Sequence, residues 1–175
     1  KSGLYLPTEV AAITFTNKAA REMRERIGKV VGADSVEGLT ISTFHALGLR
    51  MLERECAAVG LRRGFSILGE DDARTLIKDL APPETGREQL DALRNLISRA
   101  KNAGLDPGAA SKAAGSPRER AAADLYAQYQ QRLLAFNAVD FDDLIALPVR
   151  LLSEDDERRL RWQQRWRYLL VDEYQ

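Results

Sequence analysis

The sequence contains very little cysteine and histidine, with Cys56 and His45 as the only examples among 175 residues. A single thiol forms no internal disulfide, and one thiol with one imidazole does not provide the ligand set of a zinc or iron-sulfur site. Apolar runs such as 144–147 and 168–171 fall far short of the ~20 residues that a membrane helix needs. These absences predict a cytoplasmic protein without metal-thiolate chemistry, membrane span or secretory leader.

An excess of one charge is also missing, since 26 basic side chains balance 26 acidic ones. The net charge falls along the chain, from +3 in residues 1–63 through 0 in residues 64–139 to −3 in residues 140–175. This balance excludes the strongly basic composition typical of many nucleic-acid-binding domains. Any contact with DNA must therefore come from specific residues.

The first part of the chain alternates strand and helix patterns. Val10 to Phe15 is a short β-type run, Asn17 is a suitable cap for the helix that follows, and residues 39–42 form a second strand pattern. Ser42 or Thr43 can cap the next helix. Such alternation predicts a parallel sheet covered by helices, with ligands beyond the carboxyl ends of the strands.

The middle of the chain, residues 64–139, shows helical patterns only, and we interpret it as a helical insertion. Capping boxes at 85–88 and 116–119 mark two helix starts. Residues 140–175 return to the first pattern, and we expect three boundaries there. Pro148 should end or kink one helix, Ser153 should cap another, and 168–171 should form a buried strand.

Two adjacent carboxylates, Asp172 and Glu173, follow this last apolar run. At the tip of a parallel strand, one carboxylate can hold a hydrated Mg²⁺ while its neighbour polarises a water for attack on a phosphoryl group. An acidic turn after a strand is the simpler interpretation. Two acids alone do not distinguish the two.

Two loops combine hydroxyls with an aromatic ring at the ends of predicted strands. The run 14–23 places Phe15 beside the start of a helix, which suits a phosphate contact and a base stacked on the ring. In the alternative, Phe15 belongs to the core and Asn17 merely caps the helix. The run 42–45 repeats this composition, although His45 alone is more often a structural residue than a catalyst.

Four runs in chain order carry a resemblance to a known family. The runs Ile13–Met23, Ile41–His45, Val139–Leu144 and Leu169–Gln175 resemble motifs of the Rep, PcrA and UvrD group of superfamily 1 DNA helicases, most of all its Rep branch. The resemblance implies an α/β fold, an incomplete RecA-like parallel sheet called 1A with an inserted all-helical subdomain called 1B. Residues 1–63 and 140–175 would then belong to 1A, and residues 64–139 to 1B.

The resemblance also implies roles for individual residues. Asp172 resembles the Mg²⁺-associated acid of the Walker B motif, and Glu173 the base that orients the attacking water beside the metal. Gln175 resembles the residue that links nucleotide state to the DNA groove. The positions similar to single-strand contacts of the family are Thr14, Phe15, Asn17, Thr43 and His45.

The function implied by the resemblance is that of an ATP-dependent 3′-to-5′ DNA helicase that uses Mg²⁺ in replication restart or repair. Its substrates would be single-stranded DNA and the junction with duplex, its partners replisome or repair proteins, and its location the nucleoid of a bacterial cytoplasm. Lys1 in place of Met suggests a piece of a longer protein.

The phosphate-binding pattern G-x-x-x-x-G-K-[ST] does not occur in these 175 residues, so we expect this piece alone to be inactive on ATP. An alternative is a non-catalytic module that keeps the fold and binds only DNA or protein. A helicase-nuclease subunit of the RecB kind is a third possibility, and the compact helical block disfavours it.

Overall fold

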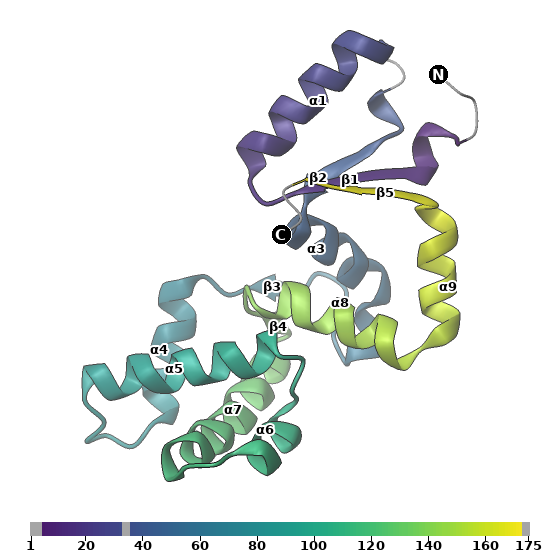
Figure 1. Ribbon diagram of the computed structural model, residues 1–175. Helices are drawn as coiled ribbons and strands as arrows, with labels where there is room; N and C mark the ends of the chain where they lie inside the picture. Colours follow the sequence, from purple (N-terminus) through teal and green to yellow (C-terminus); the bar gives the residue numbers. More distant parts are fainter. Residues whose placement is uncertain (1–4, 33–35, 173–175) are drawn as a thin grey trace. The chain divides into compact units, whose positions relative to one another are not determined.

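The computed structural model describes residues 5–32 and 36–172, drawn as a ribbon in Figure 1. The chain divides into two compact units, one made of residues 1–50 with 151–175 and one of residues 51–150. The domain bounds expected from the sequence stay a prediction. No helix among the described residues is long and apolar enough to cross a membrane.

The elements in chain order are a 3-10 turn η1 (Pro7–Glu9), β1 (Val10–Thr14), α1 (Asn17–Val31), β2 (Thr40–Thr43), α3 (Phe44–Glu55), a 3-10 turn η2 (Cys56–Val59), β3 (Ser66–Ile67), α4 (Glu70–Leu80), α5 (Arg87–Asn102), α6 (Pro107–Ala113), α7 (Pro117–Ala135), β4 (Ala138–Val139), α8 (Asp143–Glu154), α9 (Asp156–Arg165) and β5 (Tyr168–Val171).

The first unit contains a parallel sheet of three described strands in the order β2-β1-β5. The central strand β1 is the most buried, because Ala11, Ala12 and Ile13 are almost completely removed from solvent. Helix α1 lies over the sheet, and its Ala20 packs with Ala12 and with Ile41 of β2 in one apolar cluster. The predicted parallel arrangement is thus confirmed.

The strand β5 forms where the sequence predicts it, but the prediction that it is buried is wrong. Tyr168, Leu169 and Leu170 are 45–57% exposed. The described sheet pairs β5 with β1 only, from Val10 with Tyr168 onwards, so the strand lies at its edge. Adjacent strand residues point to opposite faces, so the exposure of both Leu169 and Leu170 shows that neither face of β5 is covered as those of β1 are.

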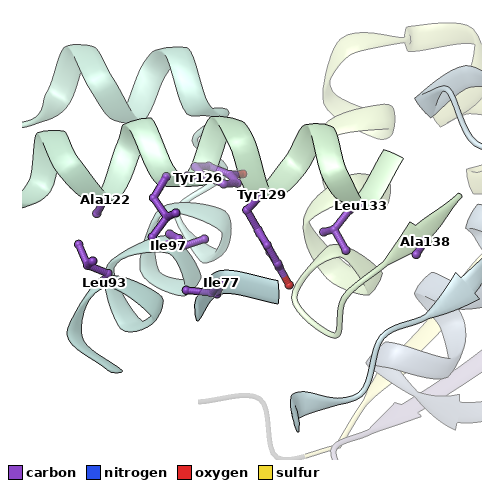
Figure 2. Packing of buried hydrophobic residues seen from close by; sticks show 9 residues of the cluster. Ile77, Leu93, Ile97, Ala122, Tyr126, Tyr129, Leu133 and Ala138 are labelled. Atoms are coloured by element: carbon purple, nitrogen blue, oxygen red, sulfur yellow. The ribbon is translucent and has the colours of Figure 1, made fainter. Parts of the chain in front are cut away.

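The second unit is mainly helical, and its core lies between α4, α5 and α7. Tyr129 and Leu133 of α7 pack with Ile77 of α4 and with Leu93 and Ile97 of α5, as Figure 2 shows. The expectation of helices only was wrong in one respect. The two-residue strands β3 and β4 pair in parallel and join the two ends of this block.

Several helix boundaries test the capping predictions. The prediction of a box at 116–119 is confirmed for the cap itself, because the backbone N–H of Glu119 donates to Ser116 Oγ at 3.2 Å. The Glu119 carboxylate accepts from Ser116 Oγ at 3.0 Å and from the backbone N–H of Gly115 at 2.9 Å, in place of the Ser116 N–H that a full capping box would use. The hydrogen bonds hold the pKa of the Glu119 carboxyl below its usual range. The box at 85–88 is wrong, since Gly86 occupies the cap without a side-chain bond.

Pro148 does not end its helix, because it lies inside α8, which continues to Glu154 and includes Ser153. The alternative that Pro148 kinks the helix stays a prediction, whereas the expected cap at Ser153 is wrong. Leu147 and Leu151 are buried one turn apart on α8, and we attribute the tolerance of Pro148 to this packing, which offsets the lost hydrogen bond. Asp155 caps α9 instead of Ser153 by accepting from the N–H of Arg158 at 2.8 Å.

A buried ionic cluster ties the turn before α8 to the helices of the second unit. The Lys101 ammonium, whose side chain is 0% exposed, donates to Asp140 Oδ2 at 2.7 Å and to Asp143 Oδ1 at 2.9 Å. The Tyr129 hydroxyl donates to Asp140 Oδ2 at 2.9 Å. Burial raises the pKa of the Asp143 carboxyl, and it also raises the pKa of the Tyr129 hydroxyl, with the charge of Asp140 adding to the effect. The four side chains of Lys101, Tyr129, Asp140 and Asp143 therefore satisfy one another's charges and hydrogen bonds inside the unit.

Replacement of Lys101 tests how strongly this cluster stabilises the fold. Lys101→Met keeps most of the side-chain volume but leaves two buried carboxylates without a cation. We therefore expect it to lower the free energy of unfolding by about 3–5 kcal/mol. Urea denaturation of the intact protein measures the change. The control Lys112→Met, on exposed α6, should stay within about 0.5 kcal/mol. Equal stability of the two variants would contradict the interpretation.

Candidate functional site

The carboxyl ends of the three parallel strands meet at one edge of the sheet. Thr14 pairs with Thr43 in the register of β1 and β2, and Ile13 pairs with Val171 in that of β1 and β5. Asp172 continues the second register, because its backbone N–H donates to the carbonyl oxygen of Ile13 at 2.9 Å. Residues distant in sequence are thus brought together at the edge where parallel sheets bind ligands.

Asp172 is the described carboxylate at this edge, and it is exposed. Mg²⁺ in nucleotide sites usually binds one or two carboxylates together with waters and phosphate oxygens. No group of three or more potential metal ligands occurs among the residues that the structure describes. An exposed carboxylate is the donor type that such a site uses, and binding of Mg²⁺ by Asp172 stays a prediction. Glu173 and Gln175, the other two residues expected here, lie outside the described residues.

The ring of Phe15 is 62% exposed at the end of β1, so the alternative that it belongs to the core is wrong. The ring contacts that of Phe44, with ring centroids 5.3 Å apart and planes tilted by 54°. Two rings at the end of neighbouring strands form an apolar surface on which a base could stack. Contact with DNA stays a prediction.

Phe44 was not among the predicted site residues, although the sequence carries a signal for it. Each ring directly follows a threonine that ends a strand, and these threonines, Thr14 and Thr43, are partners in the register. Register partners place the residues after them side by side. The repeated Thr-Phe pair at two successive strand ends therefore indicates a pair of rings.

The threonine hydroxyl groups at this edge, those of Thr14 and Thr43, have structural roles. Thr14 and Thr43 are only 2% and 7% exposed. Thr43 Oγ1 accepts from the N–H of Ala46 at 3.2 Å and so caps the start of α3. We therefore expect any contact of these two residues with a ligand to be made by the backbone rather than by the hydroxyl.

The start of α1 differs in one residue from the expectation. Thr16, not Asn17, caps the helix, since Thr16 Oγ1 accepts from the N–H of Ala19 at 3.1 Å. Asn17 is the first helical residue, and its side chain is exposed beside Phe15. His45 lies half-buried in the first turn of α3. Asn17 thus has its amide available for a ligand at this edge.

Comparison with known proteins gives a consistent match along the chain. The family of UvrD/REP helicase N-terminal domains matches residues 1–175. The chain is 46% identical over 173 residues to the ATP-dependent DNA helicase Rep of Salmonella typhimurium, and 41% identical over 172 residues to the ATP-dependent DNA helicase PcrA of Leuconostoc citreum. These matches cover 98% and 97% of this chain.

The matched segment is a small part of each relative. It covers 26% of Rep and 23% of PcrA, so the chain spans about a quarter of the length of the curated relatives it matches.

The loss of folding stability on truncation of Phe15 tests whether its ring is exposed. We expect Phe15→Ala to lower the free energy of unfolding by about 0.5–1.5 kcal/mol, because it removes an exposed ring and one aromatic contact. Ile13→Ala, which truncates a buried side chain on the same strand, should cost about 2–5 kcal/mol. Urea denaturation of both variants measures the difference, and an equal loss would place Phe15 in the core.

Proposed function

Because the chain belongs to the UvrD/REP helicase N-terminal domain family, we propose that the protein couples ATP hydrolysis to 3′-to-5′ movement along single-stranded DNA and to unwinding of duplex DNA. The observation that carries the proposal is the shared edge of the sheet. There the backbone of Asp172 is bonded to β1, whose next residues lead into the exposed ring of Phe15. A carboxylate for nucleotide chemistry and a ring for a base thus lie at the end of the same pair of strands.

In the nucleotide part of the proposal, Asp172 holds hydrated Mg²⁺ through its carboxylate. The ion supplies positive charge that stabilises the phosphate oxygens when it is bound. Glu173 would orient the attacking water and accept its proton, and Gln175 would transmit the state of the nucleotide to the DNA groove. The exposure of Asp172 supports this assignment, because a hydrated ion needs room for its waters.

In the DNA part of the proposal, a base stacks on Phe15 with Phe44 behind it. Stacking on an aromatic ring tolerates any base, which suits an enzyme that moves along a strand regardless of its sequence. The exposed amide of Asn17 and the free backbone N–H groups at the start of α1 favour contact with a phosphate. Thr14, Thr43 and His45 complete the groove from the neighbouring strand ends.

The wider role follows from the same family. We place the protein in replication restart or DNA repair, acting at junctions of single-stranded and duplex DNA together with replisome or repair proteins. Its place would be the nucleoid of a bacterial cytoplasm.

The water-orienting role predicts a specific defect. In the intact protein, Glu173→Gln should slow ATP hydrolysis by about 10²–10⁴-fold, because the amide cannot accept the proton of the attacking water. Nucleotide affinity should change by less than about threefold. Phosphate release and nucleotide titration measure the two quantities, with Glu53→Gln on α3 as the control. An intact wild-type protein without hydrolysis would instead support the non-catalytic module.

The stacking role predicts a separate defect in DNA binding. Phe15→Ala should weaken binding of single-stranded DNA by about 1–3 kcal/mol with little dependence on base sequence. Phe15→Tyr keeps the ring and should bind DNA within about threefold of the wild type. Fluorescence anisotropy with homopolymeric oligonucleotides measures both. Unchanged affinity of Phe15→Ala would remove Phe15 from the DNA groove.

A further inference from the structure

We propose that the outer edge of β3 is a docking site for an extended, basic segment of a partner protein, which adds to β3 as a further strand. The site lies within the unit of residues 51–150. It is separate from the proposed function, because it involves neither the nucleotide nor the DNA assigned to the sheet of the first unit.

The backbone of β3 is bonded on one side only. The N–H groups of Ser66 and Leu68 donate to the carbonyl oxygens of Asn137 and Val139, at 3.0 and 2.8 Å. Successive residues of a strand direct their backbone groups to opposite sides, so Ile67 directs its N–H and its carbonyl oxygen away from β4. The part of the chain that the structure describes supplies no hydrogen-bond partner for these two groups. The outer edge of β3 is therefore open.

The two strands of this small sheet differ in how well they are covered. Ala138 and Val139 of β4 are 3% and 1% exposed, whereas both residues of β3 are exposed and Ile67 reaches 44%. Proteins normally pair, cover or charge an open strand edge. An apolar residue on an open edge is thus a place where an extended chain can add.

A cavity of about 480 Å³ lies beside this edge, and the segment from Ile67 to Gly69 forms part of its lining. Three core residues labelled in Figure 2, Ile77, Ile97 and Tyr129, also line it. Phe141, whose ring is 59% exposed, belongs to the same lining. Strand addition combines main-chain hydrogen bonds with pockets for alternate side chains. The cavity therefore suits a large apolar side chain of the added strand.

The charge of the cavity favours a basic partner. Arg94 pairs with Glu70, and Lys101 is already bonded to the two buried carboxylates of the ionic cluster. Asp142 also lines the cavity, and its carboxylate accepts from Asn102 Nδ2 at 3.4 Å but forms no ion pair with a described residue. A lysine or arginine of the added strand would supply this missing cation. A nucleic acid would instead bring phosphates to the carboxylate and has no row of amides for the strand edge.

The first measurement asks whether the edge is open in the intact protein. Hydrogen exchange at single-residue resolution should show the amide of Ile67 exchanging at least about 10-fold faster than that of Leu68, which is bonded to β4. Equal protection of both amides in the free intact protein would show that another part of the same protein covers the edge. That result would overturn the proposal.

The second measurement uses a capped hexapeptide of alternating leucine and arginine, with affinity for the intact protein read by fluorescence anisotropy. The peptide should bind and should protect the amide of Ile67 from exchange. The same peptide with every backbone nitrogen methylated, and a hexapeptide of alternating leucine and glutamate, should each bind at least about 10-fold more weakly. Equal binding of the methylated peptide, or no binding of the first peptide at about 1 mM, would overturn the proposal.

Substitution of Ile67 tests the edge from the side of the protein. Ile67→Pro removes the outward N–H but leaves the bonds of Ser66 and Leu68 to β4, because proline is tolerated where its nitrogen faces away from the partner strand. We expect it to weaken peptide binding at least about 10-fold, whereas Ile67→Val should stay within about threefold. Slow exchange of the Leu68 amide checks that β3 still pairs with β4. Unchanged binding in a folded Ile67→Pro variant would contradict the proposal, and the methylated peptide decides if the variant does not fold.

The charge preference has its own matched pair of variants. Asp142→Asn should weaken binding of the leucine-arginine peptide by about 2- to 5-fold. Asp124→Asn, at an exposed carboxylate of α7, should stay within about 1.5-fold. Equal effects of the two variants would show general electrostatics and overturn the basic preference.

Two further results would assign the edge to another occupant and so overturn the proposal. One is dimerisation of the intact protein that is lost in Ile67→Pro, which would make a second copy the occupant. The other is binding of oligothymidylate that is lost in Ile67→Pro while peptide binding persists, which would make the occupant a nucleic acid.

Discussion

The parallel pairing of β5 with β1 is the contact on which the candidate site depends. It joins Tyr168 to Val10 across most of the chain, and closing such a long loop has an entropic cost that only additional contacts can offset. Two side-chain contacts support the closure within the first unit. Trp166 Nε1 donates to Thr40 Oγ1 at 3.1 Å, and the Arg167 guanidinium donates to Glu9 Oε1 at 3.2 Å. Without this pairing, Asp172 would have no fixed place beside β1.

The sequence predicts the parts of the site that obey local rules. The strand patterns at 10–15 and 39–42 place β1 and β2 to within one residue of their ends at Thr14 and Thr43, and the parallel order follows from helices between the strands. The cap at Ser116 could be predicted because its partner, the N–H of Glu119, lies three residues along the chain. Thr16 and Asn17 are both good caps, so composition alone could not decide between them.

The sequence does not predict features that need distant partners. Lys101 stands in the last turn of α5, where a cation is ordinary because it faces the helix dipole, and its carboxylate partners lie 39 and 42 residues further along. The exposure of β5 was missed for a related reason. An apolar run predicts a strand, but whether that strand is covered depends on which other segments pack on it, as Leu169 shows.

The ionic cluster also restricts how this unit can change over generations. Removing only the amine of Lys101 leaves two buried anions, and removing only Asp140 or Asp143 deprives the buried ammonium of one of its two acceptors, so each first step is costly. An apolar replacement becomes acceptable only when all the charged members change together. We therefore expect substitutions at the three positions to be tolerated only together, and a chimera whose junction separates α5 from α8 to keep this core only when both parents supply matching residues.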